Sequence, residues 1–96
     1  MRDHIYFVYI TTNPRKTVLY TGVTNDLARR TQEHFENRGK KETFAGKFFC
    51  YKLIWFETFE DINEAIAREK QIKDLSREKK EALIAELNPK WNVLRI

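Results

Sequence analysis

Four side chains in the first third of the chain are of the types that bind and cleave a phosphodiester. Tyr9 and Tyr20 lie in two short β-patterns, and Arg30 and His34 follow one helical turn apart. A guanidinium can donate to two phosphate oxygens at once and keeps its charge at every relevant pH. A phenol, whose pKa is about 10, becomes a useful base only beside a cation or a metal-bound water. The four residues together predict a site for phosphoryl chemistry.

Each of these residues also has a purely structural interpretation. Most tyrosines in strands pack one face of a sheet, and Tyr9 and Tyr20 could do only that. Arg30 could be a surface arginine bonded to a glutamate of its own helix, and Arg29 competes with it as the phosphate ligand. His34 is either a satisfied core group or a hydrogen-bond partner of the substrate.

Glu69 is a charged residue at a position where the helical pattern predicts an apolar one. The apolar side chains of the helix predicted at 61–74 are Ile62, Ala65, Ile66 and Ile72, and Glu69 falls within that stripe. Because an unpaired buried carboxylate is costly, Glu69 is expected to bind a cation. Mg²⁺ often uses a single protein carboxylate together with waters and phosphate oxygens. The alternative is a salt bridge from Glu69 to Arg30 or another basic residue. Both can apply, the salt bridge in the free protein and the metal in the complex with DNA.

The hydrophobic pattern predicts an α/β fold in which a small three-stranded sheet is flanked by three helices, in the order β-β-α-β-α-α. The strands are predicted at 5–11, 17–23 and 49–57, and the helices at 26–37, 61–74 and 77–87. The turn cluster at 13–16 predicts a hairpin between the first two strands. The third strand is apolar on both faces, which favours the central position in the sheet.

Local signals predict where several elements begin and end. Gly22 is expected to end the second strand, and Thr24 or Asn25 to cap the first helix. Ser76 is expected to cap the last helix. Residues 38–47 are polar and basic and contain two glycines, which predicts a mobile loop.

Composition predicts one compact domain over residues 1–96, with 42% hydrophobic and 14% aromatic residues available for a core. No charge-free stretch approaches the roughly 18 residues of a membrane-spanning helix. The lone Cys50 lies in an apolar run and cannot form an intramolecular disulfide. These features predict a protein without membrane insertion, located in the cytoplasm.

The net charge of +4 is concentrated in one half of the chain. Residues 1–48 hold nine Lys and Arg against five Asp and Glu, and residues 49–96 hold nine against nine. Such an excess suits a polyanionic partner, although many proteins carry it as a solvated surface. The side chains predicted to follow a DNA backbone are Arg29, Arg38, Lys40, Lys41 and Lys47. Those of the loop are interleaved with Phe44 and Phe48. The alternative for 38–47 is a solvated loop.

The chain resembles the GIY-YIG nucleases. The resemblance rests on Tyr20-Thr21-Gly22, on Phe7-Val8-Tyr9, and on an Arg ten positions after the second Tyr. Family members also carry a His or Tyr four residues beyond that Arg, a metal-binding Glu on a later helix, and an Asn near the end. Those places are occupied by Tyr9, Tyr20, Arg30, His34, Glu69 and Asn92. The chain is most similar to the small stand-alone bacterial members.

Two positions depart from the family pattern. Phe7 stands where the family name has Gly, as in other small members. Val23 stands where excision-repair nucleases of the family carry a Lys, which removes a cation that could activate the phenol.

The resemblance implies a metal-dependent endonuclease that hydrolyses DNA phosphodiester bonds, in DNA repair or recombination. It implies that Glu69 holds Mg²⁺ or Mn²⁺, that Tyr20 helps to deprotonate the attacking water, and that Arg30 neutralises the phosphate. Tyr9 would support by hydrogen bonding, and His34 and Asn92 would orient the substrate. The alternative is a binding module with little activity of its own, whose protein partner supplies substrate recognition.

Overall fold

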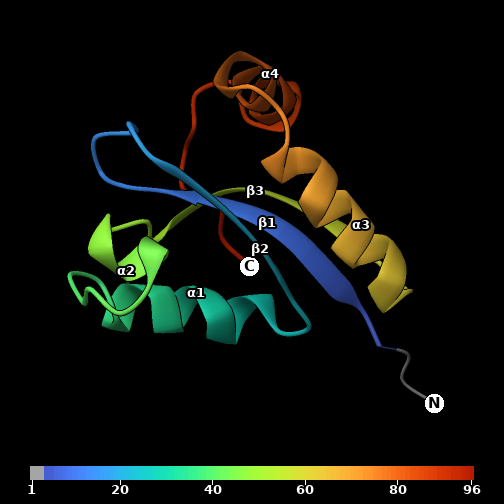
Figure 1. Ribbon diagram of the computed structural model, residues 1–96, viewed down its shortest axis with the longest axis horizontal. Coiled ribbons are helices and arrows are strands. Elements are labelled where there is room, and N and C mark those ends of the chain that lie inside the picture. The colour runs from blue at the N-terminus through green and yellow to red at the C-terminus, as the bar shows by residue number, and fades with distance from the viewer. Residues whose placement is uncertain (1–3) are drawn as a thin grey trace.

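Three strands form an antiparallel sheet in the order β2-β1-β3. They are β1 (Tyr6–Thr12), β2 (Leu19–Thr24) and β3 (Lys52–Phe59). The helices are α1 (Leu27–Glu36), the one-turn α2 (Phe44–Lys47), α3 (Ile62–Lys73) and α4 (Arg77–Leu87). The computed structural model describes residues 4–96 and is shown in Figure 1. The predicted α/β fold and its element order are confirmed, with α2 as an addition.

The first two strands pair as the predicted hairpin, from Phe7 opposite Thr24 to Thr12 opposite Leu19. Its turn is closed by one side chain, because the Asn13 Oδ1 accepts from the backbone N–H groups of Thr17 and Val18, both at 2.9 Å. An Asn side chain that replaces backbone acceptors in this way is a standard turn device.

The prediction that the apolar run 49–57 is the central strand is wrong, because β1 lies between β2 and β3. The run is apolar on both faces since helices cover both sides of β3. A register shift opposite Ile10 and Thr11 directs the adjacent Ile54 and Trp55 into the same cluster. The outer edge of β3 is partly covered by the C-terminal segment, in which the Leu94 N–H donates to the Leu53 carbonyl at 2.8 Å.

Three local predictions also need correction. Gly22 does not end its strand but lies inside β2, opposite Tyr9. The N-cap of α1 is Asp26, whose side chain accepts from the Arg29 N–H at 3.1 Å, in place of the predicted Thr24 or Asn25. The predicted loop at 38–47 contains α2 and is tied by backbone hydrogen bonds. The cap at Ser76 is confirmed, since its Oγ accepts from the Lys79 N–H at 3.2 Å.

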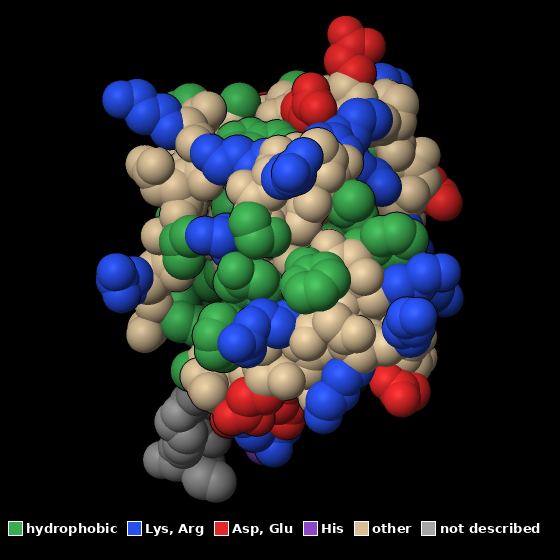
Figure 2. All heavy atoms as spheres, turned by 90° about the vertical axis from the view of Figure 1, so that its left-hand side faces the viewer, with side chains coloured by type: hydrophobic (Ala, Val, Ile, Leu, Met, Phe, Trp, Pro, Cys, Tyr) green, Lys and Arg blue, Asp and Glu red, His purple; other side chains and the backbone are tan. Residues whose placement is uncertain are grey.

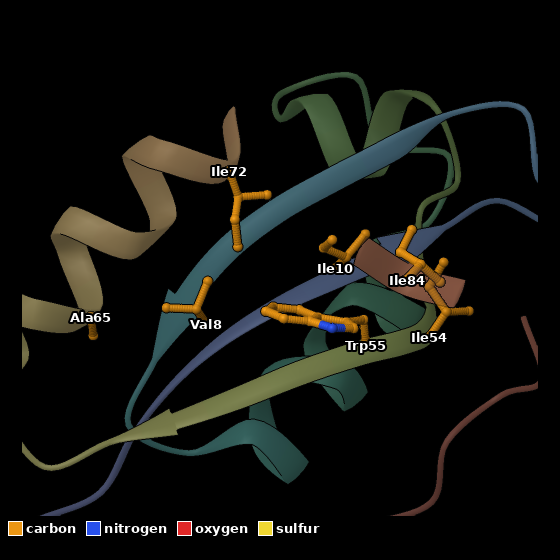
Figure 3. Packing of buried hydrophobic residues seen from close by; sticks show 7 residues of the cluster. All are labelled: Val8, Ile10, Ile54, Trp55, Ala65, Ile72 and Ile84. Atoms are coloured by element: carbon orange, nitrogen blue, oxygen red, sulfur yellow. The ribbon is translucent and has the colours of Figure 1, made fainter. Parts of the chain in front are cut away.

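The two faces of the sheet carry different layers. In Figure 1, α1 and α2 lie on one side, here called the α1 face, and α3 and α4 lie on the other, the α3 face. Figure 3 shows the α3-face core, made of Val8, Ile10, Ile54, Trp55, Ala65, Ile72 and Ile84. The α1-face core is Tyr9, Leu27 and Leu53, with Phe7, Tyr20, Phe56 and Leu94 packed against it. Alternate residues of β1 thus serve different layers.

No helix within residues 4–96 is both long enough and apolar enough to cross a bilayer.

Candidate active site

Two strands and one helix bring three rings together on the α1 face. Tyr9 comes from the central strand, Tyr20 from the edge strand β2, and His34 from the last turn of α1. The ring centroids lie 6.2 Å apart for Tyr9 and Tyr20, 5.7 Å for Tyr9 and His34, and 5.3 Å for Tyr20 and His34. Adjacent strands and one helix face therefore position three of the predicted site residues side by side.

The deepest contact of the cluster is a hydrogen bond of 2.8 Å between the Tyr9 hydroxyl and His34 Nε2. Tyr9 is fully buried and His34 is 5% exposed. Burial first, and then the charge of Arg30, lowers the pKa of His34 to about 4, so the imidazole is neutral at neutral pH. Burial, followed by the neighbouring Tyr20, raises the pKa of Tyr9 above its ordinary value. Tyr9 therefore stays a phenol, hydrogen-bonded to a neutral imidazole.

Gly22 makes room for this arrangement. It is the cross-strand partner of Tyr9, and a Cβ at its position would lie 2.6 Å from the Tyr9 Cζ. The phenol ring lies where any other residue would place its side chain. A glycine inside a strand commonly marks such a close approach.

Arg30 lies one helical turn before His34, with its side chain 36% exposed. Its Nη1 donates to the Glu33 Oε1 at 3.0 Å, which is the bond expected of a surface arginine. Burial alone would lower the pKa of Arg30, but the Tyr9 hydroxyl, Glu33 and the Tyr20 hydroxyl outweigh it and raise the pKa. Arg30 is thus a fixed cation beside both phenols, with a surface open to an anion.

Glu69 has a local partner. Its Oε2 pairs with the Lys73 Nζ at 2.8 Å, one turn along α3, and its side chain is 15% exposed. The expectation of a largely buried carboxylate with a cation is met by this lysine and not by Arg30. No hydrogen bond or ion pair within residues 4–96 joins Glu69 to the ring cluster, whose core lies on the other face.

The donor set for a metal ion is correspondingly sparse. Across the described part of the chain, no group of three or more His, Cys, Asp or Glu could hold an ion. A Mg²⁺ ion that takes most of its ligands from water and phosphate fits a single carboxylate, and Glu69 has the hard oxygen that it requires. The helix that carries Glu69 contacts β2, the edge strand of Tyr20. Residues from both layers can therefore approach a ligand that lies across this free edge.

Asn92 stands apart from the ring cluster. It is exposed in the segment after α4, where the buried Asn88 side chain holds its backbone through bonds of 3.1 Å and 2.7 Å. The neighbouring Trp91 packs on the α3-face core. A contact of the Asn92 side chain with substrate stays a prediction.

The predicted backbone-binding residues are all exposed. Arg29 is engaged on the surface of α1 with Asp26 and Glu33. The other four form no ion pair with any carboxylate in residues 4–96, and they are Arg38, Lys40, Lys41 and Lys47. These four cations are available to a polyanion.

The sequence placed Phe44 among the cations of the basic loop, but it did not indicate that Phe44 lies beside Tyr20. Its ring lies 6.3 Å from that of Tyr20, with an angle of 26° between the planes. The residues are far apart in the chain and meet only because α2 forms. The one local signal is Thr43, whose side chain caps α2 by accepting from the Gly46 N–H at 3.0 Å.

Comparison with known proteins identifies the family of the chain. The GIY-YIG catalytic domain matches residues 5–82, a span that includes Tyr9, Tyr20, Arg30, His34 and Glu69 but not Asn92. A UPF0213 protein of Haloquadratum walsbyi is 40% identical over 90% of this chain and 92% of its own. A UPF0213 protein of Bacillus velezensis is 37% identical over 88% of this chain and 80% of its own.

The fold comparison points the same way. A UPF0213 protein of Bacillus halodurans, solved by NMR, superimposes with a TM-score of 0.56 and 33% identity. The match covers 91% of this chain and 89% of that one. The chain therefore belongs to the GIY-YIG family, with small proteins of the UPF0213 type among its relatives.

Proposed function

We propose that this chain is a metal-dependent endonuclease that hydrolyses DNA phosphodiester bonds, in DNA repair or recombination, with residues 1–96 acting as one catalytic domain. The observation that carries the proposal is the convergence of two phenols and a guanidinium at one end of the α1 face, with Arg30 partly exposed. A pair of hydroxyls beside a fixed cation suits a reaction in which negative charge grows on phosphate oxygens.

The proposed roles follow from burial and hydrogen bonding. Arg30 binds the scissile phosphate and stabilises its charge. The hydrogen bond to Glu33 holds the Arg30 side chain in place. Tyr20, on the edge strand, helps to deprotonate the attacking water. Tyr9 is too deeply buried and too weakly acidic to act as a base, and it orients the site through its bond to His34. His34 acts mainly by holding Tyr9 through this bond. Contacts of His34 and Asn92 that orient the substrate are a lesser part of the proposal.

The proposal assigns the metal ligand to Glu69. A bound Mg²⁺ or Mn²⁺ would polarise the scissile phosphate and its leaving oxygen. Lys73 neutralises Glu69 in the free protein, and it would have to yield one carboxylate oxygen when the ion arrives with DNA. Lys73 is half-exposed, so solvent can accept its ammonium at little cost.

A cytoplasmic location is part of the proposal. Cys50 is a free thiol, 1% exposed, and burial raises its pKa to about 11. Such a thiol is unreactive, and a free buried thiol without a disulfide suits the reducing cytoplasm.

A second candidate is a nucleic-acid-binding module that acts with a protein partner. The observation that favours it is the pairing of Glu69 with Lys73, apart from the ring cluster. In that case the four unpaired cations would bind DNA, and the partner would supply recognition of the cleavage site.

Nicking of DNA by the purified protein separates the two candidates. Plasmid, single-stranded, flapped and branched DNA would be incubated with Mg²⁺ or Mn²⁺. Arg30→Ala, Tyr20→Phe and Glu69→Gln should each abolish cleavage, while only Arg30→Ala should also weaken binding, because it alone removes a phosphate ligand.

Arg29→Ala is the matched control for Arg30→Ala. Arg29 is the preceding residue, carries the same charge and has a side chain 66% exposed, but it lies outside the ring cluster. It should reduce binding slightly and leave the cleavage rate of bound DNA unchanged. Equal nicking by Glu69→Gln and wild type would remove Glu69 from the mechanism, and no nicking of any substrate would favour the binding module.

A further inference from the structure

An exposed row of aromatic rings leads away from the candidate active site. The Phe44 ring lies against Tyr20, as described above, and its centroid is 4.8 Å from that of Phe48. Phe44 is 51% exposed and Phe48 is 38% exposed. We call Tyr20, Phe44 and Phe48 the aromatic row. It presents ring surface to solvent directly beside the residue proposed to activate water.

The row is held by a fixed scaffold. The Gly39 N–H donates to the Gly46 carbonyl at 2.8 Å, which ties the preceding loop to α2. A Cβ at Gly46 would collide with the Lys40 carbonyl oxygen and lie 2.8 Å from that of Asn37, so backbone packs closely on both sides. Phe44, which begins α2, and Phe48, its C-cap, are therefore presented by a helical turn that is tied to the end of α1.

Cations without a carboxylate partner in residues 4–96 lie beside the row and on the loop before it. The Lys47 Nζ lies 5.4 Å from the centroid of the Phe48 ring, and Arg38, Lys40 and Lys41 are exposed on the preceding loop. Figure 2 views the side of the molecule on which α2 lies, and there hydrophobic side chains alternate with Lys and Arg. Aromatic faces among cations are the features with which proteins bind single-stranded nucleic acid without strong sequence preference.

We propose that the aromatic row stacks unpaired bases, and that the protein therefore prefers DNA with a single-stranded segment next to the cleaved bond. In a duplex each base is covered by its neighbours, and only an unpaired base offers a free face to Phe44 or Phe48. A base stacked on Phe44 brings its backbone to Tyr20 and Arg30, while Lys47 and the loop cations bind the adjoining phosphates. The inference deepens the proposed function and rests on it for the identity of the reacting bond.

An anionic membrane surface would also suit aromatic and basic side chains. DNA is favoured because the row is continuous with the ring cluster: Tyr20 contacts both Phe44 and His34. A membrane-binding patch has no reason to be joined to buried tyrosine and histidine groups.

The test is equilibrium binding without divalent metal, measured by fluorescence anisotropy. The probes are a labelled oligonucleotide of about 15 nucleotides, its duplex, and a strand of the same length whose central nucleotides lack bases. Wild type should bind the complete single strand more tightly than the duplex. Phe44→Leu and Phe48→Leu keep apolar bulk and remove the flat ring, and each should lower single-strand affinity about tenfold. The abasic strand should bind wild type as weakly as the complete strand binds these variants.

Two controls make the outcome specific. Phe35→Leu makes the same change at a phenylalanine that is 43% exposed and lies under Arg38, outside the row, and it should change single-strand affinity less than twofold. Phe44→Tyr keeps the ring and should bind like wild type. Since the altered side chains are exposed, all variants should show the wild-type melting curve.

Several results would overturn the inference. They are equal affinity of wild type for complete and abasic strands, an equal loss in Phe35→Leu, or a loss in the row variants that appears only with phosphatidylserine vesicles. The assay needs no cleavage, so its failure is distinct from failure of the proposed nuclease. If the protein cut duplex and flapped DNA equally, the proposed nuclease function would stand and the proposed role of the aromatic row would be wrong.

Discussion

The two faces of the sheet are built from alternate residues of the same strands but have different chemistry. Val8 and Ile10 point into the α3-face core, a cluster of buried hydrophobic side chains. Tyr9, between them, points to the α1 face and bonds to the buried His34. Apart from Glu69 and Asn92, the residues proposed to act in the chemistry lie on the α1 face.

This division teaches how a small domain can carry a buried polar site without losing its fold. Burying a phenol and an imidazole is tolerable only because each satisfies the other. Apolar burial on the opposite face supplies stabilisation that does not depend on protonation. Variants on the α3 face should therefore change stability and leave the site intact, whereas variants on the α1 face should change the site first.

Ile72→Ala should give the largest change in stability. Ile72 is fully buried in the α3-face core, and its truncation should lower the free energy of unfolding by about 2–5 kcal/mol. Urea denaturation measures this loss. The NMR titration of His34 should be unchanged, because no atom of the ring cluster is altered. A shifted His34 titration in Ile72→Ala would show that the two faces are coupled.

His34 should make stability depend on pH on the α1 face. Its pKa is about 4 in the folded protein, against an ordinary value of 6.5, so the unfolded chain binds more protons between these limits. The contribution is complete above about pH 6.5 and is lost as the pH falls towards 4, by up to about 3 kcal/mol.

Unfolding measured in urea at several pH values tests this dependence. His34→Gln should flatten the curve between pH 6.5 and 4, because Gln takes up no proton. His4→Gln changes the other histidine, which is exposed, and should keep the wild-type curve. A wild-type curve in His34→Gln would mean that other groups titrate there.

The element order could be predicted from the sequence because helices, strands and the hairpin depend on local patterns. The strand order could not, because the apolar run of β3 is explained by helices on both sides and not by neighbouring strands. Gly22 shows a similar limit. Its type suggested a strand end, and only the position of Tyr9 across the hairpin explains why a glycine lies inside β2.

The candidate site divides in the same way. Tyr9, Tyr20, Arg30 and His34 come together because two paired strands and the next helix fix them, which short spacing can indicate. The partner of Glu69 was within reach of the sequence, because Lys73 lies four residues on, the usual distance for a helical ion pair. The contact of Phe44 with Tyr20 was not, since it depends on the tertiary position of α2.

Gly22→Ala should disturb the ring cluster at a moderate cost in stability. The added methyl group would lie 2.6 Å from the Tyr9 Cζ, so the fully buried ring must move. We expect a loss of about 1–3 kcal/mol and rupture of the Tyr9 to His34 bond. The pKa of His34, followed by NMR, should rise towards its ordinary value as the ring opens to water. Val23→Ala, at the next residue, should lower stability without moving that pKa, because Val23 packs on the α3 face.

Thr11→Val should have the smallest effect and the opposite sign. Thr11 is fully buried, and its Oγ1 has no hydrogen-bond partner within residues 4–96. Val has nearly the same shape and lacks the hydroxyl, so the free energy of unfolding should rise by about 0–1 kcal/mol. Thr12→Val is the matched control: Thr12 is equally buried, but its hydroxyl donates to the Val18 carbonyl at 2.8 Å. That variant should lose about 1–2 kcal/mol, because the Val18 carbonyl would keep only the weak Cys50 thiol donor, at 3.8 Å. If both variants lost stability equally in urea, an ordered water would have to satisfy Thr11, and the α1 face would hold a buried solvent site beside Tyr20, its cross-strand neighbour.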